Sequence, residues 1–150
     1  MEAFAQHIHR GIVALEKGDA QGAARIFTKL ISRKRNDPDL LHLTSLAYIQ
    51  SGKEVKAAKY LKFALKIDNS HSDANNTQGV LLRQQGRIQE AILCFETAAR
   101  SNPKNLRAQR NLGQALSGGN RNIEAIEIFV RLSKLLPDDG VLYELLGNAY

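Results

Sequence analysis

Apolar residues recur along the chain at the spacing of an amphipathic helix. Between Ile88 and Ala99 they fall at positions i, i+3, i+4 and i+7, which places them on one face of a helix. Glycine, asparagine or the pair Asp37-Pro38 marks breaks between such segments. Read in this way, the chain is predicted to form helices at about 4–17, 20–34, 38–51, 54–67, 72–85, 88–101, 106–118, 122–135 and 140–150.

One set of positions repeats every 34 residues. Four kinds of residue recur at this interval: an alanine, a turn glycine, a small residue and a bulky apolar residue. Several series in one frame do not arise by chance, so the chain contains an internal repeat. The series are Ala23, Ala57, Ala91 and Ala125; Gly18, Gly52 and Gly86; Gly11, Ser45, Gly79, Gly113 and Gly147; and Phe27, Leu61, Phe95 and Phe129.

The repeat predicts a single array of helix pairs over residues 1–150. The small residues allow the two helices of a copy to approach closely. The turn glycines can take a positive φ after a helix, and Gly118-Gly119-Asn120 serves this purpose in the fourth copy. The copies run over about 4–37, 38–71, 72–105 and 106–139, with a partial fifth copy at 140–150.

These positions resemble the pattern of the tetratricopeptide repeat family. The fourth copy carries Leu112-Gly113, Ala125, Phe129 and Pro137 where the family has its Leu-Gly pair, alanine, aromatic residue and proline. The resemblance covers residues 4–150 without insertion or deletion. It implies an all-α fold, a right-handed superhelical solenoid of antiparallel helix pairs, in which the first helix of each copy lines a concave groove.

The resemblance also implies where a partner would bind. In the family, the inner face is formed by set positions of each first helix, and here these positions are polar and rich in hydrogen-bond donors. We therefore expect a protein-interaction scaffold that holds a peptide or helix of a partner protein in the groove. The groove residues expected to contact the partner are Asn76, Arg83, Gln84, Arg107, Arg110, Asn111, Gln114 and Asn148.

The charge of the chain, +6 overall, is concentrated in the first two copies, which carry +4 and +2. Five lysines lie along one side of the second helix of the second copy. A solvated face explains them, and weak binding of nucleic acid or of an acidic surface is the alternative, with nucleic acid disfavoured. The lysines are Lys53, Lys56, Lys59, Lys62 and Lys66.

No arrangement of residues in the sequence indicates catalysis. Cys94, the single cysteine, lies inside a helix beside Phe95 and is interpreted as a small packing residue rather than a nucleophile. His7 and His9 face different directions on a helix, so they do not form a metal motif. We expect no enzyme activity, no cofactor, no metal and no membrane segment, and a cytoplasmic location.

Two further expectations concern the protein beyond these repeats. The sequence phrases in copies two and three also resemble, more weakly, the N-terminal repeat arrays of bacterial glycosyltransferases or sulfotransferases. This implies an alternative function, a repeat arm that orients substrates for a larger transferase. The partial fifth copy ends in apolar residues such as Tyr143 and Tyr150, which predicts possible self-association through an open C-terminal repeat.

Overall fold

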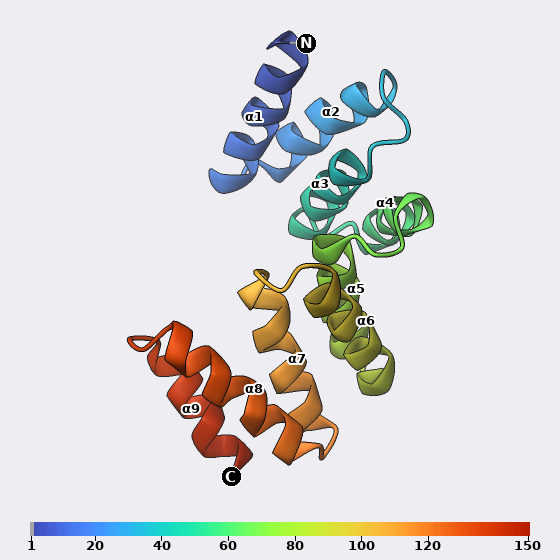
Figure 1. Cartoon of the computed structure of the whole chain (residues 1–150). Coiled ribbons are helices and arrows are strands. Elements are labelled where there is room, and N and C mark those ends of the chain that lie inside the picture. Colours follow the sequence, from blue (N-terminus) through green and yellow to red (C-terminus); the bar gives the residue numbers. More distant parts are fainter. Residues whose placement is uncertain (1) are drawn as a thin grey trace. The chain divides into compact units, whose positions relative to one another are not determined.

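The computed structural model describes residues 2–150, and every regular element in that range is an α-helix (Figure 1). Each of the four complete copies of the repeat forms a pair of helices joined by a tight turn, and the partial fifth copy forms a single helix. The helices are α1 (Glu2–Glu16), α2 (Ala20–Ile31), α3 (Pro38–Gln50), α4 (Glu54–Ile67), α5 (Ser72–Gln84), α6 (Ile88–Ser101), α7 (Leu106–Gly118), α8 (Asn122–Leu135) and α9 (Gly140–Ala149).

The chain divides into two compact units, residues 1–71 and residues 72–150, and the division falls between the second and third copies of the repeat. In the first unit each helix packs on the next, from α1 to α4, and α1 also touches α3. In the second unit α5 to α9 pack in the same sequential way, and α5 lies beside α7. Contact between alternate helices is the packing that stacked helix pairs require.

Each unit has its own core, built from the repeated alanines and aromatic residues. Phe27 lies in the core of the first unit, and Phe95 and Phe129 lie in that of the second. Each ring packs directly over the glycine of the preceding helix, at Gly79 for Phe95 and at Gly113 for Phe129. The small-residue series is therefore explained by the close approach of an aromatic ring to the backbone of a helix.

The turns follow the predicted pattern. Gly18, Gly52 and Gly86 have φ values of 82°, 70° and 76°, in the left-handed region that glycine enters without steric cost. In the fourth copy Asn120 takes this conformation, with a φ of 62°. Asparagine tolerates the region better than most residues, so a fourth glycine at this position is not needed.

Helix ends agree with the sequence to within a few residues, and the largest difference is at α2. We expected this helix to reach residue 34, whereas it ends at Ile31. The backbone amides of Arg33 and Lys34 both donate to the carbonyl of Leu30, at 3.0 Å each, so the regular ladder stops there. Across residues 2–150, no helix combines the length and apolar composition that a bilayer crossing needs.

Candidate functional site

The first helices of the third and fourth copies, α5 and α7, carry seven of the eight expected groove residues. On α7 the four residues Arg107, Arg110, Asn111 and Gln114 are spaced at i, i+3, i+4 and i+7, so they share one face of the helix. On α5 the residues Asn76, Arg83 and Gln84 occupy a comparable stripe. The eighth, Asn148, lies on α9.

Two side-chain hydrogen bonds join α5 to α7 across this polar face. The Asn111 amide nitrogen Nδ2 donates to Oδ1 of Asn76 at 2.8 Å, and Asn76 is only 6% exposed. The Arg83 guanidinium donates through Nη1 to Oε1 of Gln114 at 3.0 Å. The structure thus brings together four of the predicted residues in two pairs.

The position of Arg83 is fixed from a second direction. Its guanidinium carbon lies 5.8 Å from the centre of the Phe95 ring, in the range of a cation–π contact. Because Phe95 is fully buried and packed on Gly79, its ring is a rigid support. Arg83 is held between this ring and Gln114 and keeps further N–H groups for other acceptors.

Arg110 has a structural partner that the sequence did not reveal. Its guanidinium forms an ion pair with Asp139, and Asp139 also caps α9 by accepting hydrogen bonds from the backbone amides of Val141 and Leu142. The expected capping role of the Asp138-Asp139 pair is thus fulfilled by Asp139. Arg110 therefore ties α7 to the residue that caps α9. Gln84, Arg107 and Asn148 have exposed side chains.

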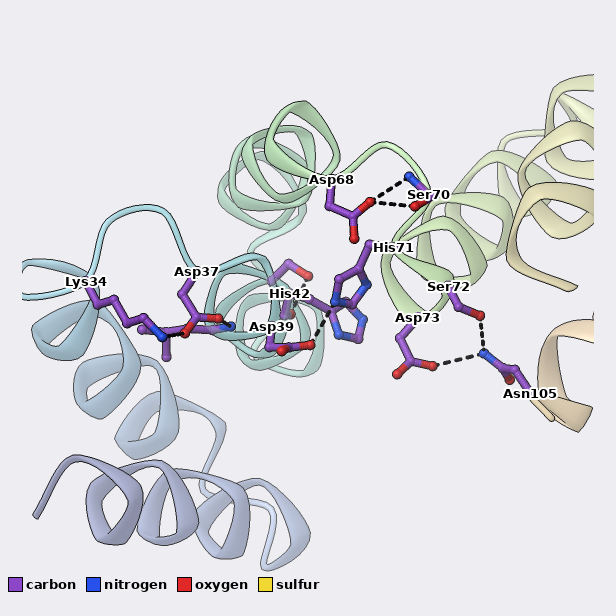
Figure 2. A network of polar contacts seen from close by, with 12 residues as sticks. Lys34, Asp37, Asp39, His42, Asp68, Ser70, His71, Ser72, Asp73 and Asn105 are labelled. Carbon is purple, nitrogen blue, oxygen red and sulfur yellow. Dashed lines mark hydrogen bonds and ion pairs between the residues drawn. The ribbon is translucent and has the colours of Figure 1, made fainter. Parts of the chain in front are cut away.

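Asn105 is a polar residue of the second unit that we did not predict. Its Oδ1 caps α7 by accepting from the amide of Ala108, and its Nδ2 donates to Ser72 Oγ at 2.9 Å and to Asp73 Oδ1 at 3.0 Å (Figure 2). An asparagine directly before a helix was the available signal. Asn105 fixes the start of α7 against the start of α5.

The first unit has a polar cluster of its own around the start of α3. His71 Nε2 lies 2.9 Å from Asp39 Oδ1, and the rings of His71 and His42 are 5.7 Å apart and tilted (Figure 2). His42 is almost fully buried, and Asp39 is exposed. Among residues 2–150, no three side chains of His, Cys, Asp or Glu lie close enough together to hold a metal ion.

Cys94 is half-buried on α6, close to Glu90. Desolvation by burial raises the pKa of its thiol, and the negative charge of Glu90 raises it further. Both effects disfavour the thiolate, which is the form that attacks electrophiles. This environment agrees with a packing role for Cys94.

Comparison with known proteins identifies the repeat. A family model described as tetratricopeptide repeat matches residues 76–140. The BBSome complex member BBS4 of Bos taurus is 26% identical over 140 residues, covering 93% of this chain and 27% of that protein. Protein FlbA of Caulobacter vibrioides is 24% identical over 144 residues, covering 96% of this chain and 24% of that protein. The chain spans about a quarter of the length of these relatives.

Solved structures match the fold over nearly the whole chain. PilF of Pseudomonas aeruginosa has a TM-score of 0.87 at 20% identity, covering 99% of this chain and 68% of that one. MamA of Desulfovibrio magneticus has a TM-score of 0.81 at 21% identity, covering 99% and 84%. A tetratricopeptide repeat protein of Parabacteroides merdae has a TM-score of 0.76 at 23% identity, covering 98% and 57%. The 34-residue period, the all-helical fold and the match over residues 76–140 thus make the chain similar to tetratricopeptide repeat proteins.

Proposed function

We propose that the chain is a non-catalytic scaffold that binds a segment of a partner protein along the polar face of α5 and α7. The observation that carries this proposal is the pair of hydrogen bonds between these helices, Asn76 with Asn111 and Arg83 with Gln114. The tetratricopeptide fold supports a role in protein interaction in general, and the two paired contacts support the choice of this face.

The polar face suits the backbone of a peptide because its amide groups have bonding capacity left. Each Asn or Gln amide has two N–H donors and a carbonyl oxygen with two lone pairs. The bonds between Asn76 and Asn111 and between Arg83 and Gln114 use one donor and one acceptor of each pair. The remaining donors and acceptors can pair with the N–H and C=O groups of an extended segment.

Rigidity adds to affinity at this face. Side chains that are already held in one rotamer lose little conformational entropy when a ligand binds. Asn76 is buried, and Arg83 is held between Gln114 and Phe95, so both are preorganised. Arg107 is exposed at the start of α7 and offers a two-pronged contact to a carboxylate of the partner.

A reversal of charge at Arg107 tests the proposal. Peptides selected from a displayed random library on the full chain would be titrated against the wild type and Arg107→Glu. We expect Arg107→Glu to weaken binding about tenfold, or about 1.4 kcal/mol, because an attractive contact with a carboxylate becomes repulsive. Arg110 is a poorer choice, since its substitution would also break the ion pair with Asp139.

The control is Arg100→Glu, which makes the same change of charge at an exposed residue of α6. This variant should bind the selected peptides as the wild type does, and circular dichroism should give the same helicity for all three proteins. Equal affinity of Arg107→Glu and the wild type would reject this face as the binding site. A parallel loss in both variants would indicate a response to overall charge alone.

The transferase arm, self-association and the cytoplasmic location remain proposals. A substrate-orienting arm of a larger transferase is an alternative that the sequence of the complete protein would decide. Self-association through α9 would use the exposed residues Val141 and Tyr143 of this helix and Tyr150 after it. Sedimentation at several concentrations would detect it. A cytoplasmic location would be tested by fractionation of the native cells.

A further inference from the structure

The first unit contains a hollow that is distinct from the polar face of α5 and α7. It has a volume of about 590 Å³ and lies between the segment after α2, the start of α3 and the second half of α4. We call it the α2–α4 hollow. Its apolar wall is made by Ile31, Leu41, Tyr60, Phe63 and Ile67, and its charged rim by Arg35, Lys59 and Lys66.

Two large apolar side chains of this hollow are open to solvent. Phe63 is 45% exposed and Ile67 is 44% exposed, one turn apart on α4. A single exposed apolar residue needs no explanation, but two neighbours in a concave, largely apolar site are the arrangement of a binding pocket. The volume is sufficient for an aromatic or leucine side chain of a ligand.

The corresponding place in the second unit carries hydrogen-bonded polar side chains. Residues 68 positions further along the chain occupy the same place in the repeat, so Gln109 corresponds to Leu41 and Arg131 to Phe63. Gln109 is buried and donates to the carbonyl of Pro103 at 2.5 Å, while Arg131 donates to Gln109 Oε1 at 3.2 Å. Polar side chains thus stand in the second unit where the first unit has Leu41 and Phe63.

The segment after the early end of α2 contributes to the lining of the hollow. The second helices α4, α6 and α8 all end at the same repeat position, two residues later than the position at which α2 ends. The backbone of residues 32–37 therefore leaves the helix direction sooner, and Arg35 and Asn36 reach the rim of the hollow. Arg35 stands where the third copy has Pro103, so a cation replaces a proline there.

The positive charge of the hollow favours an acidic ligand. Three cations line it and no carboxylate does. The neighbouring carboxylates are engaged, since Asp37 pairs with Lys34 and accepts from the amide of Leu40, and Asp68 accepts from Ser70 (Figure 2). In the second unit Glu127 takes the place of Lys59 and Pro103 that of Arg35, while Lys134 keeps the cation at the place of Lys66. The first unit therefore differs by two cations and by the absence of a carboxylate in the lining of its hollow.

We infer that the α2–α4 hollow is a second docking surface, which binds an acidic segment of a partner protein through an apolar anchor side chain. The anchor packs on Phe63 and Ile67, and flanking Asp or Glu residues of the segment pair with Arg35, Lys59 and Lys66. The apolar wall distinguishes this ligand from a nucleic acid, whose backbone would need the cations alone.

A designed peptide tests the inference. The probe is a fluorescent helical peptide with leucines at i, i+3 and i+4 and glutamates elsewhere, and its charge-swapped partner carries lysines in place of the glutamates. Fluorescence anisotropy with the full chain should show binding of the acidic peptide at least about tenfold tighter than of the basic one. Added salt should weaken the binding.

Two substitutions copy residues that the second unit already carries at these places. Phe63→Arg removes the apolar anchor site but adds a positive charge, so a loss of about tenfold in affinity would come from the apolar contact alone. Lys59→Glu removes part of the cationic rim and should cause a similar loss. The control is Val55→Arg, on the same helix and 87% exposed outside the hollow, which should bind as the wild type does.

Two results would overturn the inference. One is equal binding of the acidic peptide to Phe63→Arg and the wild type. The other is binding of single-stranded DNA or phosphatidylglycerol vesicles, lost in Lys59→Glu, without binding of the acidic peptide. Arg107→Glu should leave this affinity unchanged, so a failure here and a failure of the α5–α7 proposal are distinguishable.

Discussion

At the scale of single residues, Asp37 shows how one carboxylate fixes the start of a helix. Its Oδ1 accepts from the backbone amide of Leu40 at 3.1 Å, and its Oδ2 lies 2.7 Å from the Lys34 ammonium. Partial burial would by itself raise the pKa of Asp37, but the hydrogen bonds of Lys34 and Leu40 outweigh it, so the pKa lies below its ordinary value. Pro38 follows at the first helical position, where no donor is lost.

We expect Asp37→Ala to lower the free energy of unfolding by about 1 kcal/mol near pH 7, which is the usual effect of losing an N-cap. The exposed Asp138, which precedes the capping residue of α9, provides the control Asp138→Ala, with a change within about 0.5 kcal/mol. Urea unfolding followed by circular dichroism measures both.

The loss of stability in Asp37→Ala should depend on pH. A carboxylate with a lowered folded pKa contributes its stability fully above the unfolded pKa of about 4, and loses it as pH falls through the folded value. The difference between Asp37→Ala and the wild type should therefore shrink in acid. A difference of the same size well below the folded pKa of Asp37 and at pH 7 would mean that the carboxylate charge is not involved.

At the scale of helix pairs, the contact between a glycine and an aromatic ring sets the distance between helices. A Cβ atom added at Gly79 would lie 2.6 Å from Cε1 of Phe95, and one added at Gly113 would lie 2.5 Å from Cε1 of Phe129. The second copy has Ser45 at the glycine position and Leu61 at the phenylalanine position. Serine is larger than glycine, and leucine is smaller than phenylalanine. The sizes of the two positions are thus complementary.

Gly79→Ala is expected to destabilise the protein by about 1–3 kcal/mol, because the added Cβ would overlap the fully buried Phe95 ring and force it to shift. Gly147 stands at the same repeat position in α9, and a Cβ there would meet nothing within 4 Å. Gly147→Ala should therefore be neutral or stabilise by up to about 1 kcal/mol. Thermal unfolding of the two variants provides the comparison.

The complementary sizes predict a compensation. Phe95→Leu should reduce the cost of Gly79→Ala, since leucine accompanies serine at the corresponding positions of the second copy. Additive effects of the two substitutions, or equal costs of Gly79→Ala and Gly147→Ala, would contradict the role assigned to the ring contact.

At the scale of the whole molecule, the fold could be predicted from sequence because it depends on regular spacing. The 34-residue spacing, the turn glycines and the cap at Asp37 can be read directly from the sequence. They therefore predicted the helices and most of the helix ends. The resemblance to tetratricopeptide repeats is confirmed by the family model over residues 76–140, and the fold by the solved structures. The single array over residues 1–150 stays a prediction.

The candidate sites were less predictable because they depend on side-chain positions across helices. Asn76 pairs with Asn111, 35 positions away, and Arg83 pairs with Gln114, 31 positions away, so neither pair follows the repeat step. The ion pair that occupies Arg110 likewise needs the observed placement of α9. The lining of the α2–α4 hollow includes Arg35 and Asn36, which follow the early end of α2, and the apolar pattern does not reveal this end.

The most direct test of the account is a map of the bound peptide by nuclear magnetic resonance. On addition of a peptide selected as described above, the side-chain amide signals of Asn76, Asn111 and Gln114 should shift first, together with backbone signals of α5 and α7. Shifts confined to α6 and α8, with these three amides unchanged, would contradict the claim that the polar face of α5 and α7 binds the partner.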